Sequence, residues 1–168
     1  LINESSDKVM DGQSLSIEEI SAVALPQTLD GSEGSNRARG VVRQTAADTD
    51  VKAIRLWLAE YVNSPHTLRS YRKEAVRLLF WATQAIGKPL SSLNREDLLA
   101  YEAFLANPSA EWIDTSMPRR GSKRRLLDGP LSPRSIAQAM GILSGLFGYL
   151  VEAGYLAGTP LTLRRRGG

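Results

Sequence analysis

The chain contains no cysteine and only one histidine, His66, among its 168 residues. The absence of cysteine excludes disulfides, thiolate nucleophiles and cysteine-ligated zinc, and a single histidine excludes a histidine-rich metal site. We therefore expect no metal and no other cofactor. No apolar run approaches the roughly 18 residues of a membrane span, and the first residues are acidic where a secretory signal is basic. These absences predict a soluble cytoplasmic protein with no membrane partner.

Charge is abundant and unevenly distributed along the chain. Residues 1–36 carry a net charge of −6, whereas residues 37–168 carry a net charge of +9. A basic body is typical of proteins that bind a polyanion, of which nucleic acid is the commonest. An ordinary solvated surface with an acidic tail has the same totals, so charge alone leaves both interpretations open.

The first part of the chain resembles a linker. Ser, Gly, Asp and Glu dominate it up to about residue 47, most clearly at 30–35. Such a composition offers little apolar surface to bury. We therefore predict a flexible acidic arm over 1–47. The chain begins with leucine rather than methionine, which we interpret as the mark of a processed chain or a fragment.

From residue 48 onward the apolar residues recur three and four positions apart, the spacing of an amphipathic helix. This periodicity predicts helices over 49–62, 65–86, 94–107 and 133–153. No segment shows the strict alternation of a strand. The expected fold is all-α, a compact bundle of four to five helices over residues 48–160.

Two of these helices begin in the same way, with Ser64-Pro65 and with Ser132-Pro133. Serine is favoured at the N-cap because its hydroxyl accepts a bond from an unpaired amide, and proline follows well because it has no amide hydrogen. Arginines stand close to both openings, and the positive end of a helix is a favourable place for a phosphate. Both openings are therefore candidate phosphate sites.

The second helix carries a basic stripe opposite its apolar face. The stripe comprises His66, Ser70, Lys73, Arg77 and Gln84, with Arg69 at its edge. A helix with such a stripe fits the major groove of DNA. The alternative is the solvated face of an ordinary amphipathic helix, and the nearby Glu74 favours that alternative slightly.

The fourth helix has Arg134, Gln138, Gly141 and Gly145 opposite its apolar face. Each glycine inside a helix costs about 1 kcal/mol relative to alanine, so a compensating close contact is expected. We predict that another helix packs on the two glycines and that this helix is the centre of the bundle. Arg134, Ser135 and Gln138 then remain free to face a groove or a phosphate.

The connection over 107–131 is long and contains five basic residues within seven positions, Arg119, Arg120, Lys123, Arg124 and Arg125. Long connections in compact domains are often functional or disordered. A basic flexible loop suits contact with a phosphate backbone, and a mobile solvated loop is the alternative.

Several short motifs, taken in order, resemble the N-terminal core-binding (SAM-like) domain of the tyrosine recombinases, the phage-integrase family. In the first half they are Thr67-Leu68-Arg69-Ser70-Tyr71, Leu79-Phe80-Trp81-Ala82, Gly87-Lys88-Pro89-Leu90, and Leu93 through Asp97-Leu98 to Tyr101. In the second half they are residues 131–136, residues 143–150, Ala153-Gly154-Tyr155-Leu156 and Thr159-Pro160. The resemblance covers residues 48–165. The chain departs from the family at Thr159, where asparagine is usual, and in its long basic insertion.

The resemblance implies a helical domain that clamps one face of duplex DNA, while a separate catalytic domain, absent from this chain, clamps the other. Residues 161–168 then resemble a basic linker toward that domain. The family acts as a tetramer on DNA and needs no metal, which implies other recombinase subunits as partners and a nucleoid-associated, prokaryotic or mobile-element origin. Residues at the starts of the two long helices touch DNA in the family. Together with the basic residues above, the expected DNA contacts are Thr67, Arg69, Ser70, Lys73, Arg77, Arg119, Arg120, Lys123, Arg124, Arg125, Ser132, Arg134, Ser135 and Gln138.

Two other functions fit parts of the sequence. His66 and Arg69 match the histidine-x-x-arginine element of the family's catalytic domain, with Tyr101 downstream as a nucleophile. We reject this catalytic interpretation because no earlier catalytic arginine and lysine fit and because Tyr101 is spaced with the core residues Leu98 and Leu105. The remaining alternative is a helical protein-interaction module whose basic face meets an acidic protein, or the acidic arm of its own chain.

Overall fold

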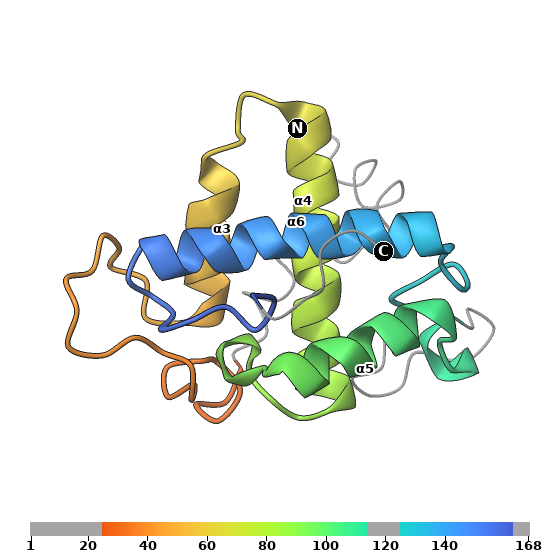
Figure 1. Ribbon diagram of the computed structural model, residues 1–168, viewed down its shortest axis with the longest axis horizontal. Helices are drawn as coiled ribbons and strands as arrows, with labels where there is room; N and C mark the ends of the chain where they lie inside the picture. The colour runs from red at the N-terminus through yellow and green to blue at the C-terminus, as the bar shows by residue number, and fades with distance from the viewer. Residues whose placement is uncertain (1–24, 114–124, 163–168) are drawn as a thin grey trace, which may run out of the picture.

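The computed structural model describes residues 25–113 and 125–162, and within them the regular structure is helical (Figure 1). The long helices are α3 (Asp50–Ala59), α4 (Pro65–Phe80), α5 (Arg95–Ala106) and α6 (Pro133–Glu152), and short helical turns occur at Trp81–Ala85, Leu90–Ser92 and Ala110–Trp112. The described part has no sheet, only one isolated bridge between Arg37 and Leu156. The regular structure of this part of the chain is helical, as predicted. The predicted helix bounds are met within three residues when the turn Trp81–Ala85, which continues α4, is counted with that helix.

Helix α6 is the element on which the other long helices pack. It contacts α3, α4 and α5, and Figure 1 shows it lying across α3 and α4, which run side by side. Its buried residues follow the helical spacing that the sequence showed: Ala139, Met140, Leu143, Leu146, Phe147 and Leu150. By length and hydropathy alone, α6 is the one helix of the described part that could span a membrane, and 33% of its apolar window is buried in the fold.

The glycines of α6 do not have the role that the sequence predicted. A methyl group added to Gly141 or Gly145 would meet no atom within 4 Å, and both residues are exposed. The helices that pack on α6 lie on its opposite face, so the expected helix contact at these glycines is wrong. Nothing in the described structure accounts for them.

Residues 25–47, predicted as part of a flexible arm, are instead fixed to the helical body. Backbone amides of this segment donate to distant carbonyls, from Asn36 to Ser91 (2.8 Å), from Ala38 to Tyr155 (2.9 Å) and from Gln44 to Ala153 (2.8 Å). These long-range hydrogen bonds, of which composition gives no sign, hold the segment together with the packing of Leu25 and Ala47 on the core. The arm prediction is therefore not met over 25–47, and residues 1–24 lie outside the described part.

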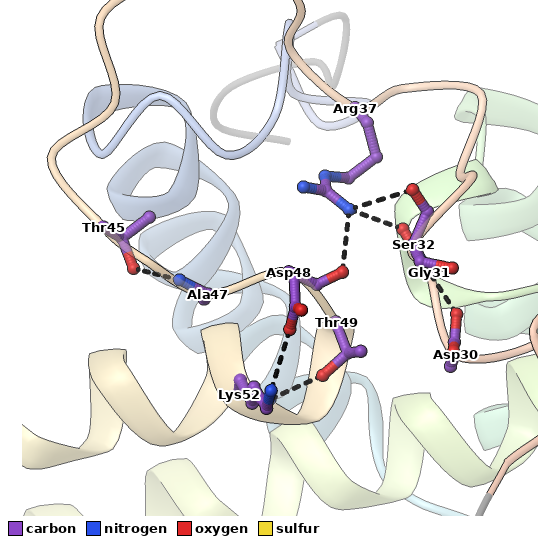
Figure 2. A network of polar contacts seen from close by, with 9 residues as sticks. All are labelled: Asp30, Gly31, Ser32, Arg37, Thr45, Ala47, Asp48, Thr49 and Lys52. Carbon is purple, nitrogen blue, oxygen red and sulfur yellow. Dashed lines mark hydrogen bonds and ion pairs between the residues drawn. The ribbon is translucent and has the colours of Figure 1, made fainter.

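Arg37 organises this segment, as Figure 2 shows. Its Nη1 donates to the carbonyls of Gly31 (2.8 Å), Ser32 (3.4 Å) and Asp48 (3.2 Å). Its guanidinium also lies 4.0 Å from the centre of the Tyr155 ring, a stacking arrangement that favours the cation. One side chain thus joins the 30–37 segment to the start of α3 and to the segment that follows α6.

Asp50, the first residue of α3, is fully buried beside this junction. Its carboxylate accepts hydrogen bonds from the Tyr155 hydroxyl (2.5 Å) and from the Ser91 amide (3.0 Å). Gly31 packs directly on it, with φ of +85°. A buried carboxylate is costly unless it is hydrogen-bonded, so these two donors and the close glycine determine how three chain segments meet.

Replacing Gly31 with alanine tests this junction. The added Cβ would overlap the Asp50 carboxylate and would also stand at a positive φ. Gly40 is a matched control, because it has φ of +71° but no atom within 4 Å of the added carbon. We expect urea denaturation to show a loss of roughly 1 kcal/mol for Gly40→Ala and roughly 3 kcal/mol for Gly31→Ala. Equal losses would contradict the packing of Gly31 on Asp50.

The pH dependence of stability provides a second test. Burial raises the pKa of Asp50 above its ordinary value of 3.8, although the bonds from Tyr155 and Ser91 oppose the shift. The folded state therefore holds this proton more tightly than the unfolded state, and ionisation of Asp50 lowers stability as pH rises from about 4. The free energy of unfolding of Asp50→Asn, minus that of the wild type, should increase between about pH 3 and pH 7.

Asp48→Asn is the control with the opposite sign. The hydrogen bond from Lys52 lowers the pKa of Asp48, so Asp48 stabilises the fold above its ordinary pKa and loses that effect as pH falls. The same difference for Asp48→Asn should therefore decrease as pH rises. A pH-independent difference for Asp50→Asn would contradict the burial of its charge.

Candidate nucleic-acid interface

Helices α4 and α6 bring polar residues from two distant parts of the sequence into one groove. The groove has a volume of about 120 Å³ and is lined by Ser70, Lys73, Glu74 and Arg77 of α4, by Leu131, and by Ser135, Gln138, Ala139 and Ile142 of α6. Five of these residues, Ser70, Lys73, Arg77, Ser135 and Gln138, were predicted from the sequence as DNA contacts. The crossing of the two helices thus places both predicted contact sets together.

The two serine-proline openings differ in their capping. At α6 the Ser132 hydroxyl accepts from the Ser135 amide (3.1 Å) and donates to the Ser135 hydroxyl (3.1 Å). At α4 the Ser64 side chain makes no capping bond, and the opening is held by the backbone bond from the Leu68 amide to the Ser64 carbonyl (2.8 Å). The predicted serine cap therefore forms at α6 and not at α4, where the Ser64 backbone has turned to φ −127° and ψ 80°.

The helix starts keep their positive ends free of acid. Neither α4 nor α6 has an acidic residue in its first turn, whereas α3 has Asp50 and α5 has Glu96 and Asp97. Acids in the first turn neutralise the positive end of the helix dipole. Of the four long helices, α4 and α6 are therefore the two whose N-termini remain favourable for an anion.

Three predicted cations are available for contact. Arg69, Lys73 and Arg134 are exposed, and none forms an ion pair with another residue of the described part. The uncharged predicted residues are also accessible: Ser132, Ser135 and Gln138 are exposed, and Thr67 and Ser70 are half-buried. This surface is thus positively charged without internal neutralisation.

The predicted basic stripe is wrong at Arg77, because this side chain does not face solvent. Its side chain pairs with Glu74 (Nη1 to Oε1, 2.9 Å), and its Nε donates to the Leu126 carbonyl (3.2 Å). The chain that follows the basic residues 119–125 covers this part of α4. Helix periodicity alone does not reveal that cover. Arg77 is a buried structural cation in the groove floor, and the exposed stripe ends at Lys73.

Glu74 is a groove residue that the sequence-based prediction of DNA contacts did not include. Its side chain is only 5% exposed, and burial raises its pKa, while the charges of Arg77 and Lys73 lower it. The three-residue spacing between Glu74 and Arg77 is the sequence signal for their pairing. The groove therefore has an acid in its floor and cations around it.

The predicted basic loop is described only at its ends. Arg119, Arg120, Lys123 and Arg124 lie outside the described residues, and Arg125 pairs with Asp128. The Leu126 amide donates to the Trp112 carbonyl (2.8 Å), so the two ends of the insertion meet. Because Leu126 also contacts Arg77, the insertion leaves the body close to the groove.

The rejected catalytic arrangement has no counterpart in the described residues. Tyr101 is fully buried, with its ring 5.1 Å from that of Trp81 and 6.1 Å from that of Phe104. Burial also raises the pKa of its hydroxyl, which disfavours the phenolate. Within the described residues, no cluster of His, Cys, Asp and Glu could hold a metal ion.

Substitution of Arg77 separates structural from exposed cations. Arg77→Ala would leave the Glu74 carboxylate buried without its partner, which typically costs about 3 to 5 kcal/mol. Arg69→Ala on the exposed surface of the same helix should change stability by less than about 0.5 kcal/mol. Thermal or urea denaturation of both variants measures the contrast. If Arg77→Ala is as stable as Arg69→Ala, Arg77 is not a buried structural cation and belongs to the exposed stripe.

Comparison of the chain with family models, with curated proteins and with solved structures gave no match. The resemblance to the tyrosine recombinases thus rests on the sequence motifs, and the candidate interface rests on the geometry described above.

Proposed function

We propose that this chain is the DNA-binding N-terminal part of a site-specific tyrosine recombinase or integrase, with the SAM-like core-binding fold of that family. The observation that carries the proposal is the shared groove of α4 and α6, which joins residues predicted from two separate motifs. If the short motifs resembled the family only by chance, nothing would require their side chains to lie together in the fold. Their convergence is what a DNA-contact surface requires.

The charges of the groove suit a duplex. Lys73 lines the groove, and Arg69 and Arg134 are exposed at the starts of α4 and α6. None of the three forms an ion pair within the described residues, and two acid-free helix starts add the positive ends of their dipoles. Serine hydroxyls and the Gln138 amide are groups that proteins use for phosphate contacts, and glutamine also reads adenine in the major groove. The major groove is about 12 Å wide and accepts a helix.

Chemistry would then belong to a catalytic domain outside this chain. In the parent protein a tyrosine hydroxyl would attack the DNA phosphate and form a covalent phosphotyrosyl bond without a metal, while one deoxyribose oxygen leaves the phosphate as a free hydroxyl. This chain would hold one face of the duplex, and other recombinase subunits would complete a tetramer on DNA in the cytoplasm or nucleoid.

The second candidate is a protein-interaction module, and one observation favours it. Val41 and Val42 are 55% and 84% exposed, and Arg39 and Arg43 beside them are exposed as well. An apolar pair between cations suits an acidic protein surface. This loop does not line the groove of α4 and α6, so the two candidates depend on different residues.

DNA binding measured against salt tests the proposal. For the triple variant Arg69→Ala, Lys73→Ala and Arg134→Ala, we expect at least roughly tenfold weaker binding to a duplex. The slope of log affinity against log salt should become shallower by about 0.9 for each phosphate that the variant no longer neutralises. A control triple with the same charge change, Arg39→Ala, Lys52→Ala and Arg55→Ala, should change affinity by less than about threefold.

The outcomes are distinct. Absence of duplex binding by the wild type at low salt would refute the proposed function. Equal weakening in both triple variants would refute the contact surface, because total charge alone would then explain binding. Failure to bind DNA, together with tight binding of an acidic protein that depends on Arg39 and Arg43, would favour the interaction module.

A further inference from the structure

The floor of the groove contains a carboxylate that DNA binding alone does not explain. Glu74 lines the groove between α4 and α6, and its side chain is 5% exposed. A carboxylate repels phosphate, and a surface that only binds DNA gains nothing from one in its floor. The position of Glu74 therefore calls for a role of its own.

The charged groups around Glu74 are few and come mainly from its own helix. Arg77 Nη1 lies 2.9 Å from Oε1 and 3.3 Å from Oε2 of Glu74, and Lys73 lines the same groove. Helix α6 contributes only uncharged residues to the lining, Ser135, Gln138, Ala139 and Ile142, and the segment before it contributes Leu131. From α5, the buried Tyr101 hydroxyl lies close enough to Glu74 and Arg77 to be influenced by both charges.

This arrangement makes the charge of the groove depend on one proton. With Glu74 ionised, Arg77 is neutralised by its partner, and Lys73 is the cation left in the lining. With Glu74 protonated, its Oε1 still accepts from Arg77, which keeps its bond to the Leu126 carbonyl. Both bonds of Arg77 are thus kept, while the lining of the groove gains one net positive charge.

We propose that Glu74 couples DNA binding to proton uptake: a duplex phosphate at the groove drives protonation of the Glu74 carboxylate, so that affinity for DNA increases as pH falls. The proton comes from solvent and is taken up at Oε2, the oxygen farther from Arg77. The inference rests on the proposed function and adds a regulation of the same site.

Two physical effects support the coupling. Burial already raises the pKa of Glu74 in the free protein, so its carboxylate takes up a proton at a higher pH than an exposed glutamate would. A phosphate in the groove adds a second negative charge within a few ångströms, and like charges at that distance raise a carboxyl pKa further. Ligand binding and protonation therefore favour each other.

Duplex affinity measured between about pH 5.5 and pH 7.5 tests the proposal. The single histidine, His66, lies in the first turn of the same helix, so all variants carry His66→Asn. A mixed-sequence duplex of roughly two helical turns at low salt is the probe. In this background, affinity should rise by up to about tenfold per pH unit as pH falls.

Glu74→Gln should remove the effect. The glutamine keeps the shape and the acceptor for Arg77, so this variant should bind at about pH 7.5 as tightly as its parent does at about pH 5.5, with no further pH dependence. The matched control is Glu152→Gln, an exposed acid in the last turn of α6 with the same change in net charge. It should keep the pH dependence of the parent.

A direct measurement covers the case in which Glu74→Gln fails to fold. The ¹³C chemical shift of the Glu74 carboxyl carbon reports its protonation, and its titration midpoint should move to higher pH when the duplex is added. An unmoved midpoint, a flat pH profile in the His66→Asn parent, or an undiminished pH dependence in Glu74→Gln would overturn the coupling. Absence of duplex binding at every pH would instead refute the proposed function.

Discussion

The packing of α4 against α6 is the interaction on which the rest of this structure depends. Helix α6 presents one apolar face to three helices, and its contact with α4 sets where the polar sides of both helices meet. Ser70 and Lys73 reach the groove from one side and Ser135 and Gln138 from the other. A shift of either helix by one residue would turn these side chains by about 100° away from each other. The candidate interface is thus a consequence of the core.

A separate junction around Asp50 holds together segments outside the groove. Asp50 is bonded to Tyr155 and to Ser91, and Arg37 stacks on Tyr155. These contacts join the segment before α3 to the segment after α6, where the chain leaves the bundle. If a catalytic domain follows, its linker begins from a fixed point. The described structure thus has a polar groove between α4 and α6 and a bonded junction made of other residues.

The sequence predicted the helices well because buried residues recur with the helical period, and Leu143, Phe147 and Leu150 are all buried as expected. It predicted the shared groove less directly, because periodicity places residues on one helix and says nothing about which two helices cross. Arg77 shows the limit of helical periodicity as a guide to exposure. Its position on the helix matches the exposed stripe, yet the chain that follows the basic residues 119–125 covers its side chain. One of the bonds that fix Arg37, from its Nε to the Tyr155 carbonyl, likewise joins residues over 100 positions apart and leaves no local pattern.

The measurement that tests the central claim most directly is a titration of the isotopically labelled protein with a DNA duplex, followed through backbone amide shifts. If the groove of α4 and α6 is the DNA surface, the largest changes will lie at residues 66–73 and 134–138. They should be reduced by salt, because phosphate contacts release counterions. Changes confined to the exposed loop at 39–43, with the starts of α4 and α6 unaffected, would contradict the account.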